Sequence, residues 1–149
     1  MQIKIGFIAL VLILFASCHH PDTSIKITEV KYGTYFGECW GYCAHDLMLT
    51  DGSSNSHHHW YGGAPDRMCT ETYSHWQSLT ESIDFDEFQQ LNEVIGCPDC
   101  ADGGAEWIEI TTDGGTHKIT FEYFNEPNET NAYIQELRDQ MEVMKEVCL

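Results

Sequence analysis

Apolar and polar residues alternate along much of this chain, which is the two-residue period of a strand with one buried face. Turn-forming pairs such as Asp51-Gly52 and Gly62-Gly63 separate the alternating stretches. In the first stretch the apolar residues change phase after Ile27, which indicates a β-bulge. The pattern predicts strands over residues 24–32, 43–51, 56–61, 68–79, 105–111 and 116–123.

Two further stretches carry apolar residues at steps of three and four, as one face of a helix requires. The first, 85–95, follows Asp84, whose carboxylate can cap the free amides of the first turn together with Glu87. The second, 130–147, has an apolar face made of Ile134, Leu137, Met141, Met144 and Cys148. The order of elements predicts an α+β fold, an antiparallel sheet of about five to six strands with two helices packed on it.

The N-terminal region shows a different pattern, a continuous apolar run over residues 5–15 that follows Lys4. This run is shorter than the roughly 20 residues of a membrane-spanning helix and is typical of a secretory signal. It ends in Phe15-Ala16-Ser17-Cys18, which resembles the lipobox at which bacterial lipoproteins are cut and acylated. The resemblance implies three parts: a signal peptide over 1–17, a lipidated tether over 18–23 and a single α+β domain over 24–149.

Acylation of Cys18, for example with palmitate, implies an exported protein whose lipid anchors it in the outer or inner membrane of a bacterial cell envelope. An ordinary signal peptide with an incidental cysteine is the alternative. The charge fits a soluble exported domain, since 24 acidic residues face only 7 basic ones. Nucleic acid is excluded as a partner, because its binding requires Lys and Arg to neutralise phosphates.

Six cysteines follow Cys18, and an even number in a small exported domain predicts up to three disulfides: Cys39, Cys43, Cys69, Cys97, Cys100 and Cys148. The connectivity stays open. Cys97 and Cys100 have the spacing of a redox pair, but Asp99 and Asp102 nearby disfavour a reactive thiolate. A zinc site that combines Cys39, Cys43 and His45 with that pair is a further alternative, which an oxidising compartment disfavours.

The consecutive histidines His57, His58 and His59 are the most unusual run. On a strand, His57 and His59 project from one face while His58 points away. Two imidazoles on one exposed face can hold Zn, Cu or Ni, and His45 or His75 from a neighbouring strand could add a third ligand. The alternative is a polar strand near a turn that binds no metal.

The chain contains no Ser/His/Asp constellation, phosphate loop or dinucleotide fingerprint, so we expect a non-enzymatic protein. The first function we consider is a module that binds a protein partner in the envelope, either as a simple interaction domain or as an inhibitor of that partner. Trp60 and Tyr61 would be its anchors, since interface hot spots favour Trp and Tyr. The second is a metal-binding lipoprotein centred on His57 and His59.

The stretch GECWGYCAHDLMLTDG resembles a group of uncharacterised exported domains of Bacteroidota-type lipoproteins. The matching residues are Gly37, Cys39, Gly41, Tyr42, Leu47, Leu49, Asp51 and Gly52. The resemblance implies a small α+β domain without an established activity. The hairpin followed by a terminal helix is also loosely similar to small proteinaceous protease inhibitors, which is a likeness of fold alone.

Overall fold

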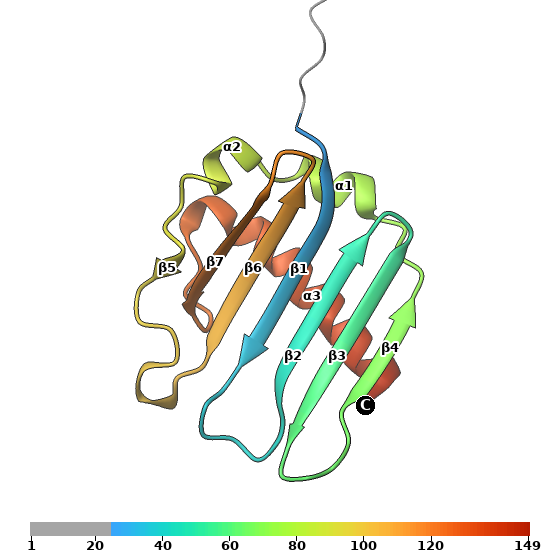
Figure 1. Ribbon diagram of the computed structural model, residues 1–149, viewed down its shortest axis with the longest axis vertical. Helices are drawn as coiled ribbons and strands as arrows, with labels where there is room; N and C mark the ends of the chain where they lie inside the picture. Colours follow the sequence, from blue (N-terminus) through green and yellow to red (C-terminus); the bar gives the residue numbers. More distant parts are fainter. Residues whose placement is uncertain (1–24) are drawn as a thin grey trace, which may run out of the picture.

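Seven strands form one sheet in the computed structural model, which describes residues 25–149 (Figure 1). The predicted signal peptide, the tether and Cys18 lie outside these described residues. The sheet order is β4-β3-β2-β1-β6-β7-β5. The strands are β1 (Ile27–Tyr35), β2 (Gly41–Thr50), β3 (Ser53–Tyr61), β4 (Arg67–Glu71), β5 (Val94–Ile95), β6 (Ala105–Thr112) and β7 (Thr116–Glu122).

The sheet is antiparallel except at one edge, where β5 pairs with β7 in parallel. The predicted mixture of helices and one sheet is confirmed, but the predicted number of five to six strands is too small. The bulge expected in the first strand lies between Ile27 and Glu29. Gly52 adopts a φ of +85° in the tight turn between β2 and β3, as the Asp-Gly pair predicts.

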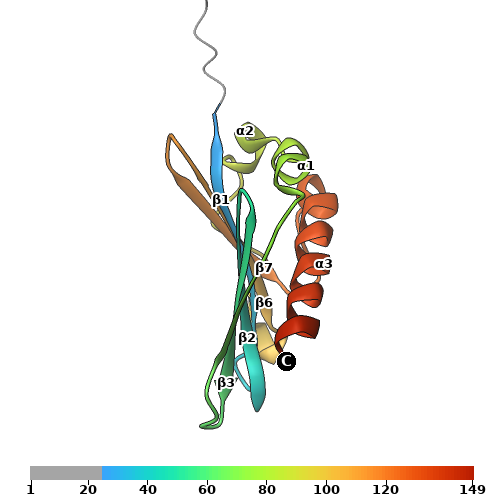
Figure 2. The ribbon, with the colours of Figure 1, turned by 90° about the vertical axis from the view of Figure 1, so that its right-hand side faces the viewer.

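One long helix covers one face of the sheet and leaves the other face open (Figure 2). This helix, α3 (Asn131–Cys148), buries the face that the sequence predicts. Its apolar residues join those of the central strands in one core, because both surfaces are apolar and exclude water together. The shorter helices are α1 (Trp76–Glu81) and α2 (Phe85–Phe88), and single 3-10 turns occupy Cys100–Asp102 and Asn128–Thr130.

The predicted helix over 85–95 is wrong in its second half. Asp84 caps it as expected, since its Oδ1 accepts a hydrogen bond of 3.1 Å from the backbone N–H of Glu87. The helix nevertheless ends at Phe88, and the chain continues into β5, which is the additional strand. Backbone pairing with β7 replaces the helical hydrogen bonds there, as in the 2.8 Å bond from Thr120 N–H to the Glu93 carbonyl.

The predicted strand over 68–79 is also wrong in its second half. Strand β4 ends at Glu71, and α1 begins at Trp76, so residues 25–149 contain three α-helices where the sequence predicts two. The helix places Leu79 in the core, fully buried. As part of a strand, Leu79 would lie along the sheet edge and outside the core, so tertiary packing overrides the local β preference.

All six predicted cysteines form disulfides within the described chain, which confirms that prediction and resolves the connectivity. Cys39 pairs with Cys43 beside the β1–β2 connection, and Cys97 pairs with Cys100 in the loop before β6. Cys69 of β4 pairs with Cys148 at the end of α3, across 79 residues of sequence. These pairs leave none of the six thiols for the zinc alternative, whereas a disulfide between Cys97 and Cys100 is also the oxidised form of a redox pair.

Candidate metal centre on the open face

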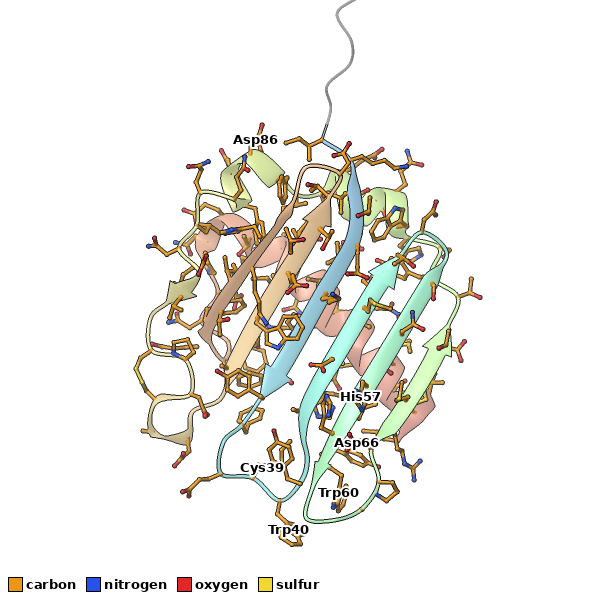
Figure 3. The ribbon with its side chains drawn as sticks, viewed as in Figure 1. Cys39, Trp40, His57, Trp60, Asp66 and Asp86 are labelled. Atoms are coloured by element: carbon orange, nitrogen blue, oxygen red, sulfur yellow. A yellow bond between two sulfur atoms is a disulfide. The ribbon has the colours of Figure 1, made fainter. Side chains whose placement is uncertain are left out.

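His57 and His59 lie side by side on the open face of β3, near the end of the sheet where the β3–β4 loop begins (Figure 3). Strand alternation sends His58, between them, to the opposite face, where it is fully buried. The ring centroids of His57 and His59 are 3.8 Å apart. Both side chains remain partly accessible to solvent, so the predicted pairing of two imidazoles on one exposed face is present in the structure.

Asp46 of β2 completes a group of three ligands. The antiparallel register places Asp46 directly opposite His57. Its Oδ2 lies 2.8 Å from Nε2 of His59. One donor atom from each of Asp46, His57 and His59 lies within 4.8 Å of the other two. The sequence interpretation did not include Asp46.

Asp66, in the loop between β3 and β4, brings a second carboxylate to the histidines. Its Oδ2 lies 3.1 Å from Nε2 of His57 and 3.2 Å from Nδ1 of His59. Its Oδ1 accepts a 2.8 Å hydrogen bond from the backbone N–H of Trp60. That N–H holds the pKa of Asp66 below its usual value, with a smaller contribution from the hydrogen bond of His57. Asp66 is therefore a fixed, negatively charged partner for both imidazoles.

The two carboxylates give this cluster a shortage of positive charge. Within residues 25–149, no Lys or Arg forms an ion pair with Asp46 or Asp66. His59 has one carboxylate beside each ring nitrogen. A neutral imidazole carries only one N–H, so it can satisfy only one of these contacts. A proton or a metal ion at the other nitrogen would satisfy both carboxylates.

His45 does not join this cluster, although the sequence interpretation offered it as a third ligand. It lies on the α3 side of β2, opposite His58 of β3. The Nδ1 atoms of His45 and His58 are 2.8 Å apart, and Nε2 of His58 lies 3.0 Å from the Ser56 hydroxyl. The alternation of a strand explains the difference, since neighbours such as His45 and Asp46 face opposite sides of the sheet.

His75, the other suggested third ligand, is also absent from the group that the structure brings together. It is exposed and precedes the first residue of α1, where its ring lies 6.0 Å from that of Tyr73. Its predicted place on a strand beside the histidine run fails because β4 ends before it, at Glu71.

The predicted partner-binding aromatics lie at the end of the sheet where the β1–β2 and β3–β4 connections meet (Figure 3). Tyr61 is exposed, whereas Trp60 is half-buried and packs edge-to-face on Tyr42, with ring centroids 4.7 Å apart. The most exposed aromatic there is Trp40, with 80% of its surface accessible. The sequence interpretation did not single out Trp40.

Within residues 25–149, no helix is long and apolar enough to cross a membrane. No protein-family model matches the chain, and no curated protein is similar enough to it to indicate a common family. The resemblance to exported lipoprotein domains therefore stays a prediction. What can be said of function rests on the geometry of the cluster formed by Asp46, His57, His59 and Asp66.

Proposed function

We propose that this protein is an exported, lipid-anchored, non-enzymatic domain that binds a transition-metal ion at Asp46, His57 and His59. The observation that carries the proposal is the convergence of one carboxylate oxygen and two imidazole nitrogens within 4.8 Å of one another. Imidazole with carboxylate is a ligand set that suits Zn, Cu and Ni ions.

The spacing of the donors is close to what an ion needs. Around a tetrahedral ion with bonds of about 2.1 Å, donor atoms are separated by about 3.4 Å. The three donors, at up to 4.8 Å, reach that spacing with small side-chain rotations. Asp66 would then accept a hydrogen bond from Nδ1 of His59 while Nε2 binds the ion, the carboxylate–histidine arrangement that orients many metal ligands.

Export is supported by the disulfides and by the N-terminal pattern. Three disulfides in one small domain are typical of an oxidising compartment outside the cytoplasm. The lipobox-like motif before Cys18 supplies the anchor in this proposal. Mass spectrometry of the protein extracted from bacterial membranes should show an N-terminal Cys18 with acyl chains. A soluble product that retains an unmodified Cys18 would contradict the anchor and leave the metal site untouched.

Calorimetry tests the metal site directly. The mature chain with Cys18→Ser, which prevents acylation, is titrated with Zn²⁺, Cu²⁺ and Ni²⁺ at micromolar concentrations. We expect saturable binding with one ion per chain, lost in His59→Asn and retained in His75→Asn. The His75 control changes the same residue type at an exposed position outside the cluster. Absence of binding in the parent chain, or equal binding in both variants, would reject the proposed function.

A second candidate function, binding of a protein partner, is favoured by the exposure of Trp40 beside Tyr61. Large aromatic side chains are common anchors of interfaces, and this end of the sheet lies opposite the end where β1 begins (Figures 1 and 3). An anchored domain would hold Trp40 away from its tether. Trp40→Ala together with Tyr61→Ala should abolish the capture of envelope partners by the purified domain. Unchanged capture by this double variant would exclude the aromatic end as the interface.

A further inference from the structure

We propose that the metal is copper and that Met68 supplies a thioether ligand. The inference rests on the proposed metal function and names its ion. It starts from the register of the sheet, which aligns three residues in one row across β2, β3 and β4. Asp46 is opposite His57, and His57 is opposite Met68. Residues directly opposite in neighbouring strands project from the same face.

Met68 is therefore a cross-strand neighbour of a proposed ligand. Directly opposite residues in an antiparallel pair have Cβ atoms about 5 Å apart. The thioether of a methionine lies two bonds beyond Cβ, and rotation about its χ angles lets it reach an ion held by the adjacent imidazole. Cys69, the next residue of β4, faces the other side of the sheet and is tied to α3 through Cys148. The disulfide thus fixes the face from which Met68 projects.

The exposure of Met68 is unusual for its type and needs an explanation. The residue is 76% exposed, although methionine is among the more commonly buried residues. It contributes nothing to the hydrophobic core that the structure describes over residues 25–149. An unpacked methionine on a strand beside two histidines has the accessibility and freedom that a metal ligand requires.

The combined donor set distinguishes copper from the alternatives. Two imidazoles and one thioether form a ligand set soft enough to hold Cu(I). Zn²⁺ and Ni²⁺ bind to carboxylate and imidazole and do not require a thioether. The carboxylate of Asp46, with Asp66 behind His59, suits Cu(II). Cu(II) also binds nitrogen and oxygen ligands more tightly than the other divalent ions of the first transition row. The site can therefore bind copper in both oxidation states, with Met68 mattering most for Cu(I).

The test is a competition titration of the Cys18→Ser chain and its Met68→Leu variant. Cu(I) is supplied under ascorbate without oxygen against a chromophoric chelator, and Zn²⁺ is measured in parallel. We expect Met68→Leu to weaken Cu(I) binding by about tenfold or more and to change Zn²⁺ binding less than about twofold. Met48→Leu is the matched control, because Met48 lies on the same open face but is opposite Asn55, so it is a diagonal and more distant neighbour of His57 than Met68 is. Thiol titration after each experiment verifies that the disulfides are intact.

X-ray absorption of the Cu(I)-loaded chain gives an independent readout. We expect a sulfur neighbour of the copper in the parent chain that disappears in Met68→Leu. Equal Cu(I) affinity in both chains, or a parallel loss of Cu(I) and Zn²⁺ binding, would overturn the copper inference. The metal function would still stand in that case if Zn²⁺ binding depends on His59. Loss of all metal binding in the parent chain would reject both.

Discussion

His45 and His58 form a buried pair directly beneath the candidate metal centre, with their Nδ1 atoms 2.8 Å apart on the α3 side of the sheet. Burial and the nearby charge of Lys145 lower the pKa of His45 to about 4, and burial also lowers the pKa of His58. Both rings are thus neutral at pH 7, and one Nδ1–H donates to the other nitrogen. The three consecutive histidines therefore lie in two environments: His57 and His59 on the partly exposed open face, and His58 buried on the α3 side.

This pair predicts a loss of stability in mild acid. A histidine with a folded pKa of about 4 and an unfolded pKa of about 6.5 binds a proton more readily in the unfolded chain. Its stabilising effect is complete above pH 6.5 and is lost as the pH falls towards 4. At pH 5 the expected loss from His45 is about 2 kcal/mol. Urea unfolding at pH 7 and pH 5 measures it: His45→Asn should reduce the pH dependence, whereas His75→Asn should leave it unchanged.

The disulfide between Cys69 and Cys148 should be the main covalent contribution to stability. It closes a loop with a sequence separation of 79, whereas Cys97 and Cys100 are separated by 3. The loop-entropy model assigns about 4.5 kcal/mol to the long loop and about 2 kcal/mol or less to the short one. Thermal unfolding of the Cys69→Ala/Cys148→Ala and Cys97→Ala/Cys100→Ala double variants compares them. A larger loss from the second pair would contradict this ranking.

Arg138 of α3 should be essential for the stability of the fold, because it neutralises a buried carboxylate. Its Nη2 lies 2.8 Å from Oε2 of Glu106, which is fully buried in β6, and it also binds Glu126. Arg138→Met would leave the Glu106 charge without its partner and should cost about 3 kcal/mol or more. Glu106→Gln in the same chain should restore part of this loss. Chemical denaturation of Arg138→Met, Glu106→Gln and the double variant gives the coupling free energy, and additive losses would contradict a direct interaction.

Asp66 should act on the metal through His59. Asp66→Asn keeps an oxygen for the Trp60 backbone N–H but removes the charge that orients the His59 ring. We expect metal affinity to fall by about tenfold, while the fold and the stoichiometry stay unchanged. Asp51→Asn, at the opposite end of the β2–β3 hairpin, removes one negative charge outside the cluster and serves as the control. Equal affinities in the two variants would remove Asp66 from the site.

Part of the candidate site could have been found from the sequence. The two-residue turn at Asp51-Gly52 places Thr50 opposite Ser53, and the same register brings Asp46 opposite His57. Alternation from that pair also puts His45 opposite His58 on the other face. The sequence interpretation used alternation within one strand but did not extend it across the hairpin, so it selected His45 where Asp46 was the neighbour.

Asp66 and Met68 could not be found in this way. Their positions depend on the path of the β3–β4 loop, which contains Gly62 and Gly63 and is longer than the two-residue turn of a tight hairpin. The register of β4 is set by the pairing of His57 with Met68 and by the bond from Cys69 to Cys148. A connection of this length allows several registers, and only the docking of α3 selects one of them.

Local sequence signals are sufficient to predict those elements whose tertiary surroundings agree with them. The hairpin of β6 and β7, the cap at Asp84 and the buried face of α3 all follow from period, turn and capping residues. The other elements depend on contacts between distant parts of the chain. Residues 89–95 are not helical, although their apolar spacing predicts a helix, because the chain there pairs with the backbone of β7. Residues 76–79 form part of α1 and not the predicted strand, because the helix buries Leu79 in the core. The disulfide between Cys69 and Cys148 and the position of Met68 depend in the same way on the register of β4, which is fixed only when the sheet and α3 pack together.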